Sequence, residues 1–269
     1  MSASAEHELR LSAAREFAVE GGKSTLEHFC TEVEVEKKGD GSPLTIADRG
    51  AETLIRKLIG ERFPDDAIVG EEFDDKEGST GWRWILDPID GTKSFISGVP
   101  LYGTMVGVEF EGSCDIGVCY FPGLDEGVFA CTGKGAWSFS GTAEPVRAKV
   151  STRKDLPDAV LVTSESETFA DRAAADVYQQ LARKVYFART WGDAYGYYLV
   201  ATGRVDVMID PILSVWDAAA VKPVIEEAGG RFTDWAGNVS IEAGESIGSN
   251  GLIHDEILAI TKPHAGRFK

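Results

Sequence analysis

The segment 84–95 constrains the fold of this chain more than any other part of the sequence. It begins as an apolar, strand-like run that ends on Asp87, and Pro88 then prevents regular strand pairing because it lacks an N–H donor. A second carboxylate, Asp90, follows within the same turn. Two carboxylates held this close repel each other unless a cation lies between them. The segment therefore predicts a strand that ends in a tight turn at a cation site, whose hard oxygen ligands favour Mg²⁺, Mn²⁺ or Ca²⁺ over Zn²⁺.

Two further acidic segments stand far from this turn in the sequence. Upstream, the short apolar run 68–70 leads directly into Glu71 and Glu72. Downstream, the segment 214–217 opens a helical pattern that ends at a pair of glycines, and it places Asp217 in the first turn of that helix. These carboxylates are candidates to join the two aspartates at one site.

Composition excludes several classes of protein. With 43% hydrophobic and 10% aromatic residues, the 269-residue chain can bury a full core, as one large domain or as two moderate domains that share an interface. Its net charge of −17 argues against binding to nucleic acid or to an anionic membrane. We expect no membrane-spanning segment and no signal peptide. The four cysteines show no C-x-x-C spacing, so we expect reduced thiols in a cytoplasmic protein.

The first half of the chain, 1–142, is expected to place two helices before a set of strands. The expected helices span 5–30 and 45–62, and the expected strands span 67–70, 82–86, 103–110, 114–121, 127–131 and 135–139. Gly21 and Gly22 are a weak point of the first helix, and the turn-forming residues of 37–43 predict a loop. Glycine-containing turns join the last four strands, which favours an antiparallel meander.

The second half, 143–269, begins after a polar connector over 141–157 and has an α/β character. Strand-like runs at 159–163, 185–189, 205–209, 231–233 and 246–249 alternate with helical runs at 167–183, 193–202, 215–228 and 254–261. Pro223 falls inside one of these helices, so we expect a kink or a broken hydrogen bond near Ala219.

The three acidic segments, taken in order, resemble the signature of the inositol monophosphatase superfamily of magnesium-dependent, lithium-sensitive phosphatases. The resemblance runs from about Lys37 to the C-terminal helix. It implies an α/β fold (α+β), a layered α-β-α-β-α sandwich with the active site between two halves. The half 1–142 would carry the metal and phosphate motifs, and the half 143–269 would carry Trp216-Asp217 and the substrate-reading residues. The family is commonly dimeric, so the resemblance also implies a homodimer.

The resemblance implies a set of metal ligands for two or three Mg²⁺ ions, with Mn²⁺ as a possible substitute. These ligands are Glu71, Asp87, the backbone carbonyl of Ile89, Asp90 and Asp217. Pro88 restricts the turn, so the Ile89 carbonyl can face the same cavity as the carboxylates. The alternative is that the two aspartates only form turns and that Asp217 only caps its helix, with Ser214 as N-cap. Both roles can hold for Asp217, because a helix N-terminus fixes a carboxylate in one orientation.

Gly91 and Thr92 resemble the phosphate-binding residues of the family, since glycine lets the backbone approach and N–H groups at a helix start bind anions. The resemblance also implies that Thr92, with Glu71 or Asp48, orients and deprotonates a water activated by the metal. The alternative for Asp48 is an acid on a helix surface. Lys38 is a candidate for contact with the phosphate or a third metal, but we expect a solvated lysine of the loop. The metals would also let an acidic protein bind an anionic substrate.

The substrate end resembles the histidinol-phosphate phosphatase branch of the superfamily. Its implied substrate-binding residues are Asp90, Gly192, Asp193, Ala194 and Asp210. Asp193 lies among aromatic residues where inositol phosphatases carry a Gly-Thr-Ala segment, and a carboxylate there would attract the cationic groups of histidinol phosphate. The alternative for Asp210 is a turn that ends a strand. The chain differs from the family at Ser94, where asparagine is usual, and Lys93 beside it is common in the histidinol-phosphate branch.

The leading interpretation is a Mg²⁺-dependent phosphomonoesterase that hydrolyses L-histidinol phosphate with a metal-activated water. An inositol-1-phosphate or broad sugar-phosphate phosphatase of the same superfamily is the alternative. A nucleotide-type bisphosphatase fits less well, because we find no basic residues placed for a second phosphate. A non-catalytic, cation-binding regulatory protein is the alternative from a different class. It is disfavoured because every expected metal ligand and Thr92 is present.

Overall fold

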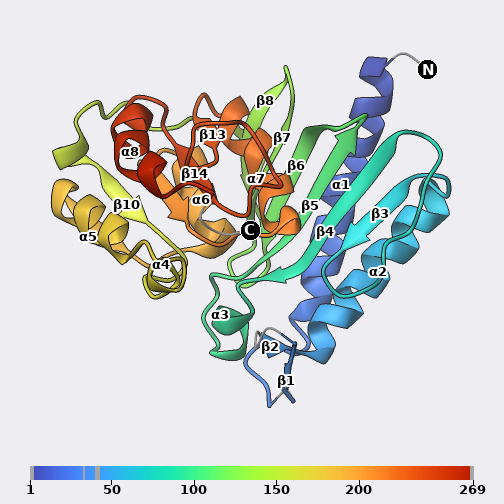
Figure 1. Ribbon diagram of the computed structural model, residues 1–269. Helices are drawn as coiled ribbons and strands as arrows, with labels where there is room; N and C mark the ends of the chain where they lie inside the picture. Colours follow the sequence, from blue (N-terminus) through green and yellow to red (C-terminus); the bar gives the residue numbers. More distant parts are fainter. Residues whose placement is uncertain (1–2, 33, 40–42, 267–269) are drawn as a thin grey trace.

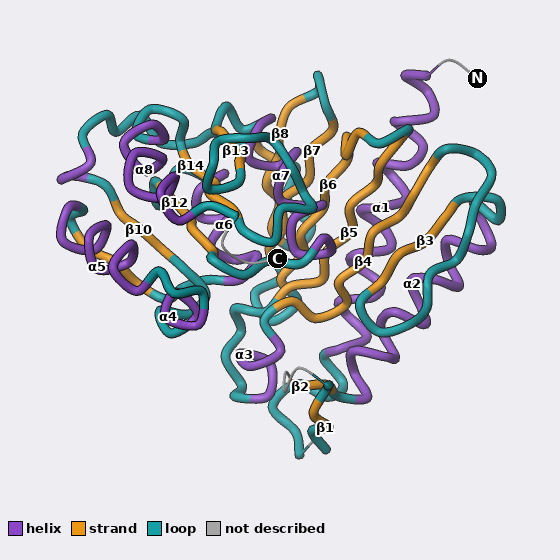
Figure 2. Tube along the Cα trace, in the orientation of Figure 1, coloured by secondary structure: helices purple, strands orange, loops and turns teal. Residues whose placement is uncertain are grey.

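The computed structural model describes residues 3–32, 34–39 and 43–266, in which two sheets and three layers of helices alternate (Figures 1 and 2). Helices α1 (Ala3–Thr25) and α2 (Ile46–Arg62) cover the outer face of a seven-stranded sheet. Helices α6 (Asp193–Ala201) and α7 (Val215–Glu227) lie between this sheet and a five-stranded one. Helices on the far side of the second sheet complete an α-β-α-β-α sandwich, which confirms the predicted fold class. No helix of the described residues is long and apolar enough to cross a membrane.

The seven-stranded sheet contains the predicted meander. In spatial order its strands are β3 (Ala67–Gly70), β4 (Trp82–Asp90), β5 (Gly103–Phe110), β6 (Ser113–Phe121), β7 (Glu126–Cys131), β8 (Gly135–Ser140) and β9 (Val146–Arg147). Only the β3–β4 pair is parallel among these strands. The prediction that β4 ends at 86 was wrong, because the strand resumes pairing beyond Pro88 after a register shift between Asp87 and Asp90. The Pro88 carbonyl accepts a hydrogen bond from the Thr104 hydroxyl at 2.7 Å.

The five-stranded sheet is built from strands of the second half and is mixed, with parallel and antiparallel pairs. Its order is β11 (Phe187–Arg189), β10 (Val160–Val162), β12 (Val207–Asp210), β14 (Ser246–Ser249) and β13 (Arg231–Thr233). Strand β10 pairs in parallel with both β11 and β12. The carboxyl ends of β10 and β12 therefore meet at one edge, where Ser164 and Asp210 come together.

The remaining elements are short and lie mostly in the second half. They are β1 (Glu36–Lys37), β2 (Pro43–Leu44), α3 (Thr92–Ile96), the 3₁₀ helix η1 (Leu156–Asp158), α4 (Thr168–Asp171), α5 (Ala175–Lys184), α8 (His254–Thr261) and the 3₁₀ helix η2 (Lys262–His264). The prediction of one helix over 167–183 was wrong, because Ala173 has a positive φ of 56° between α4 and α5. The connector 141–157 contains β9 and the start of η1. Of the expected loop 37–43, residues 40–42 lie outside the described residues.

Two glycines expected to weaken the first helix are instead required by its packing. Helix α1 runs through Gly21 and Gly22 and ends at Thr25, so the predicted end at 30 was also wrong. A Cβ on Gly21 would approach Ile55 to 2.5 Å, and a Cβ on Gly22 would approach Tyr120 to 2.7 Å. The absence of side chains at these positions lets α1 pack closely against α2 and β6.

Helix α7 continues through Pro223 and loses one internal hydrogen bond, as predicted. The Ala219 carbonyl, which Pro223 leaves without an N–H partner, accepts a hydrogen bond from the Cys114 thiol at 3.0 Å. On the sheet below, a Cβ on Gly117 would come within 1.9 Å of the Ala220 carbonyl oxygen. The helix backbone therefore lies directly on β6, and its first turn points at the end of β4.

Candidate active site

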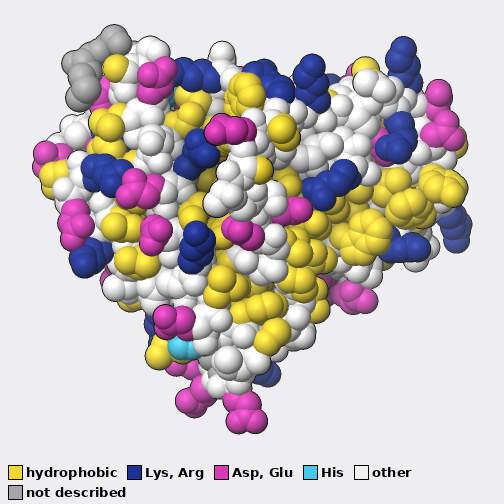
Figure 3. Space-filling model, turned by 180° about the vertical axis from the view of Figure 1, so that it is seen from behind, with side chains coloured by type: hydrophobic (Ala, Val, Ile, Leu, Met, Phe, Trp, Pro, Cys, Tyr) yellow, Lys and Arg dark blue, Asp and Glu magenta, His cyan; other side chains and the backbone are white. Residues whose placement is uncertain are grey.

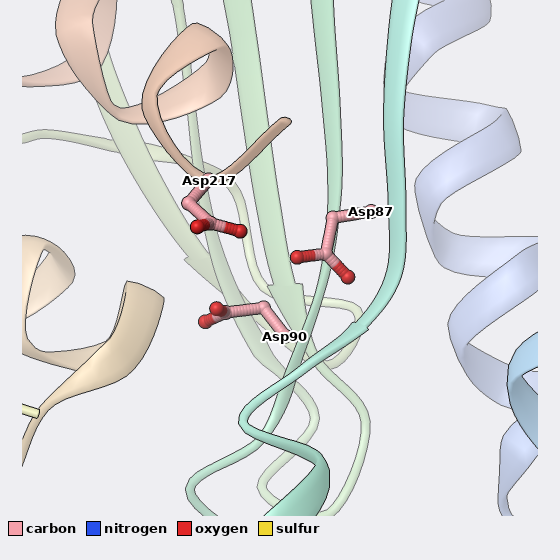
Figure 4. Close-up of side chains that lie close together, drawn as sticks. All are labelled: Asp87, Asp90 and Asp217. Carbon is pink, nitrogen blue, oxygen red and sulfur yellow. The ribbon is translucent and has the colours of Figure 1, made fainter. Parts of the chain in front are cut away.

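Three aspartates from two distant parts of the chain meet between the sheets. Asp87 and Asp90 lie at the end of β4, and Asp217 lies in the first turn of α7. One carboxylate oxygen from each lies within 4.8 Å of the others, and Figure 4 shows the three side chains facing a common space. We call Asp87, Asp90 and Asp217 the aspartate cluster. Three of the predicted metal ligands are thus brought together by β4 and α7.

The aspartate cluster lacks a compensating positive charge among the described residues. Asp87 is 2% exposed, and its Oδ1 atom has no hydrogen-bond partner among them. Burial, followed by the charges of Glu71, Asp90 and Asp217, raises the pKa of Asp87 well above its usual value. Burial also raises the pKa of Asp217 to about 7, although the Ser214 N–H donates to its carboxylate. A hard divalent cation stabilises such an arrangement, in which one buried carboxylate oxygen lacks a partner and neighbouring carboxylates repel each other.

Asp90 connects the aspartate cluster to the second half of the chain. Its Oδ2 atom accepts a hydrogen bond from the Ala194 N–H in the first turn of α6. Burial and the charges of Asp193 and Asp217 raise the pKa of Asp90 well above its usual value. Asp90 and Ala194, both expected at the substrate end, are therefore in direct contact.

The turn after β4 is held by its own backbone and by one hydroxyl. The Thr92 hydroxyl donates to the Ile89 carbonyl at 3.1 Å, so the predicted carbonyl ligand is already oriented by a side chain of the same turn. Gly91 has a φ of +80°, and a Cβ there would lie 2.9 Å from the Asp193 carboxylate. Glycine is thus required at this position both for the backbone conformation and for the approach of Asp193.

Glu71 lies outside the aspartate cluster and is paired with a lysine. Among the described carboxylates, Glu71 is not one of those within 4.8 Å of one another. Its Oε1 atom lies 2.5 Å from the Lys38 ammonium, which also contacts Glu72 at 2.7 Å. Burial opposes the charge of Lys38, but the two glutamates raise its pKa above its usual value. The expectation of a solvated Lys38 was wrong, because its side chain is only 19% exposed and is ion-paired.

Asp48 is buried, so the alternative of an acid on the helix surface was wrong. Its Oδ2 atom accepts hydrogen bonds from the N–H and the hydroxyl of Thr45 at 2.8 and 2.6 Å, which caps α2. Its Oδ1 atom has no hydrogen-bond partner among the described residues, and burial raises its pKa. The charge of Glu71 contributes to this shift, so Asp48 is electrostatically coupled to a predicted metal ligand.

An open cavity of about 480 Å³ extends from the aspartate cluster between α3 and the second half. We call it the acid-lined cavity. It is lined by Pro43, Gly91, Thr92, Lys93, Ser94, Ser97, Val99, Leu101, Ser164, Glu165, Thr168, Thr190, Gly192, Asp193, Asp210, Ile212 and Asp217. A smaller hollow of about 100 Å³ lies against it, shares several of these residues and reaches Asp90. The predicted phosphate-binding residues and most of the predicted substrate-binding residues therefore face one space.

Asp193 and Asp210 contribute to this wall in different ways. Asp193 begins α6 with a positive φ of 53°, and its N–H donates to the Ser164 hydroxyl at 2.9 Å. Burial and the nearby charge of Asp210 raise the pKa of Asp193 to about 6. Asp210 is 2% exposed and accepts hydrogen bonds from the Ser164 N–H at 3.1 Å and the Tyr197 hydroxyl at 3.0 Å. Gly192 is needed beside them, since a Cβ there would lie 2.1 Å from Ser164 Cα.

Sequence reasoning missed the segment that carries Ser164, Glu165 and Thr168. These residues follow β10 and line the acid-lined cavity. No motif marks them, but their position after a parallel strand is a usable signal, since ligands bind at the carboxyl ends of such strands.

The comparisons with known proteins agree with this geometry. The model of the inositol monophosphatase family matches residues 6–265. A histidinol-phosphatase from Chlorobaculum parvum is 45% identical, with 93% of this chain and 96% of that protein covered, and one from Mycobacterium tuberculosis is 37% identical, with 87% and 90% covered. Among solved structures, an IMPase from Thermotoga maritima has a TM-score of 0.84 at 30% identity, with 95% and 97% covered. The extragenic suppressor protein suhB from Bartonella henselae has a TM-score of 0.86 at 28% identity, with 94% and 98% covered.

The chain therefore belongs to the inositol monophosphatase family, and it is a phosphatase.

Proposed function

We propose that the protein is a magnesium-dependent phosphatase that hydrolyses L-histidinol phosphate to L-histidinol and phosphate. The observation that carries the proposal is the aspartate cluster, which holds a buried, unpartnered oxygen of Asp87 and opens onto a cavity with further acids on its wall. The name histidinol-phosphatase of the relatives from Chlorobaculum parvum and Mycobacterium tuberculosis supports this choice of substrate.

The metal ions would be held by Asp87, Asp90 and Asp217, with Glu71 and the Ile89 carbonyl as further ligands. The unpartnered Oδ1 atom of Asp87 supports this assignment, because a buried carboxylate oxygen is costly to leave unsatisfied. Glu71 would exchange its contact with Lys38 for the cation. Bound there, Mg²⁺ supplies positive charge for the phosphate and lowers the pKa of water.

The chain's own residues would position the phosphate and the water. Gly91 leaves room beside the cavity, and the N–H groups at the start of α3 provide donors for phosphate oxygens. Thr92 would fix the Ile89 carbonyl through its hydroxyl and orient the attacking water. Asp48, buried and with a raised pKa, would accept a proton in concert with Glu71.

The alcohol part of the substrate would lie in the acid-lined cavity. Asp193 and Asp210 supply negative charge there, and Gly192 and Ala194 shape the start of α6 beside them. A substrate with an ammonium and an imidazole gains from this charge, whereas a neutral polyol gains little. Inositol 1-phosphate remains the second candidate, because solved structures of inositol monophosphatases share this fold.

The deciding experiment compares kcat/KM for L-histidinol phosphate and inositol 1-phosphate at saturating Mg²⁺. We expect a strong preference for histidinol phosphate. A preference for inositol 1-phosphate would overturn the choice of substrate and leave the phosphatase class standing. Loss of turnover in EDTA and recovery with Mg²⁺ or Mn²⁺, together with inhibition by Li⁺, would test the metal assignment.

We also propose that the protein is a cytoplasmic homodimer whose two halves, 1–142 and 143–269, share the site. Figure 3 shows hydrophobic side chains gathered across much of one face of the molecule. Exposed apolar residues include Trp191 at 41% and Tyr186 at 73%, and an apolar hollow of about 370 Å³ is lined in part by Trp191 and Leu101. A broad apolar surface is typical of an interface. Sedimentation analysis should give twice the mass of 29.0 kDa.

A further inference from the structure

An ion pair between Lys93 and Glu165 lies on the wall of the acid-lined cavity. Lys93 belongs to α3 and follows Thr92 directly, whereas Glu165 follows Ser164 in the segment between β10 and α4. The pair therefore joins the phosphate end of the cavity to its substrate end. The side chains are 65% and 34% exposed, so solvent and solutes reach both groups.

The ion pair is suited to exchange rather than to stabilising the fold. An exposed lysine–carboxylate pair contributes little net free energy, since both groups are well hydrated when separated. Another cation of similar shape can therefore replace Lys93 on Glu165 at small cost. Among the described residues that line the cavity, Lys93 is the single lysine or arginine. The same lining contains four acidic residues, Glu165, Asp193, Asp210 and Asp217. A cationic ligand that enters meets an excess of negative charge.

We propose that Glu165 is a specificity-determining residue that binds the primary ammonium group of an amino-alcohol phosphate, which replaces Lys93 on the carboxylate. This inference rests on the proposed activity toward histidinol phosphate. Glu165 already holds a primary ammonium in the structure, that of Lys93, so the carboxylate is accessible to a group of the same shape and charge. In an amino-alcohol phosphate that ammonium is close in the molecule to the phosphate, as Lys93 is to Thr92.

The exchange breaks one ion pair and forms two. Once released from Glu165, Lys93 remains on the wall that Gly91 and Thr92 also line, where its ammonium is a donor for phosphate oxygens. A substrate that carries both a phosphate and an ammonium satisfies both members of the pair at once. A phosphate ester without an amine would separate Lys93 from Glu165 and leave the carboxylate without a partner.

The first experiment compares histidinol phosphate with its deamino analogue, 3-(imidazol-4-yl)propyl phosphate, which lacks only the ammonium. We expect Glu165→Gln to lower kcat/KM for histidinol phosphate by roughly tenfold to a hundredfold and to leave the analogue almost unchanged. Glu167→Gln is the matched control, because Glu167 lies two residues further on, is exposed and does not line the cavity. Equal losses on both substrates, or a wild-type enzyme that does not prefer the amine, would overturn the inference.

The second experiment measures binding of the product L-histidinol by calorimetry in the Mg²⁺-loaded protein, so that neither turnover nor the phosphate contributes. We expect Glu165→Gln to raise the Kd and Lys93→Gln, which removes the competing ammonium, to lower it. An unchanged Kd in Lys93→Gln would contradict the exchange. These outcomes are separate from the choice of substrate, since the proposed function fails only if the wild-type enzyme prefers inositol 1-phosphate.

Discussion

The two ends of the site hold their acidic side chains in opposite ways. At the metal end, Asp87 is buried with one oxygen unpartnered, and the neighbouring carboxylates add repulsion to it. At the substrate end, Asp210 is buried to the same extent, but both of its oxygens accept hydrogen bonds, from Ser164 and Tyr197. The comparison teaches that burial alone does not mark a ligand site. A cation is expected at Asp87, because the described part of the chain supplies no partner for one of its carboxylate oxygens.

The strongest test of this comparison removes one charge from the aspartate cluster. We expect Asp90→Asn to abolish measurable turnover, a loss of about a thousandfold or more, because a metal ligand is lost. The metal-free protein should not be destabilised, since the asparagine oxygen still accepts from the Ala194 N–H and a repelling charge is gone. Thermal unfolding in EDTA and in Mg²⁺ measures this: Mg²⁺ should raise the Tm of the wild-type protein and raise that of the variant less. A wild-type Tm indifferent to millimolar Mg²⁺ would contradict the metal assignment.

At the substrate end, the next largest effect concerns Asp193. Neutralising one partner of a buried charged contact costs about 2–5 kcal/mol, so Asp193→Asn should lower kcat/KM for histidinol phosphate strongly. Turnover of a phosphate ester with an uncharged alcohol part, such as glycerol 2-phosphate, should be affected weakly, because that alcohol has no positive charge to pair with Asp193. Steady-state kinetics on the two substrates separate the outcomes. If kcat/KM falls equally for both substrates, Asp193 stabilises the start of α6 and does not bind the substrate.

Thr92 tests whether the turn after β4 orients a reactant. Thr92→Ala removes the hydroxyl that donates to the Ile89 carbonyl and keeps the backbone N–H groups. We expect kcat to fall by on the order of a hundredfold with little change in KM, as for the loss of a group that positions a proton transfer. A near-normal kcat would reduce Thr92 to a residue that only stabilises the turn. Thr168→Ala is a control, because Thr168 lines the same cavity and its hydroxyl caps a different turn.

The smallest effect should be at Asp210, where the comparison predicts a cost in stability. Asp210→Ala removes the acceptor of the Ser164 N–H and of the Tyr197 hydroxyl, so the buried N–H is left unsatisfied at about 1–3 kcal/mol. Chemical denaturation measures the change in the free energy of unfolding. An unchanged stability would show that these hydrogen bonds contribute no net free energy and would remove the contrast with Asp87.

The part of the site that local sequence determines could be predicted. The turn at Pro88, the pair Asp87 and Asp90, and the capped first turn of α7 with Asp217 each follow from adjacent residues, and the structure brings the three aspartates together. The strand meander of the first half and the alternation of strands and helices in the second also followed from the apolar periods, whereas the layered sandwich was implied by the family resemblance.

The rest depends on where separate segments return in space. The ion pairs of Lys38 require a loop to fold back onto Glu71. The approach of Glu165 to Lys93 requires the segment after β10 to lie close to α3, which follows β4. The sequence left the role of Asp48 open, because its burial depends on packing that the helical period alone does not reveal. Gly21 and Gly22 were judged by their low helix propensity, whereas tertiary packing decided their role.

The position of α7 has a consequence for how the molecule comes apart. The helix belongs to the second half in sequence, yet its backbone rests on strands of the first, and its proline gap is filled by a thiol from β6. Neither half keeps its interior covered once the other leaves, so we expect the two halves to unfold together. Loss of turnover should then coincide with global unfolding, because separation of the halves would remove Asp217 from Asp87.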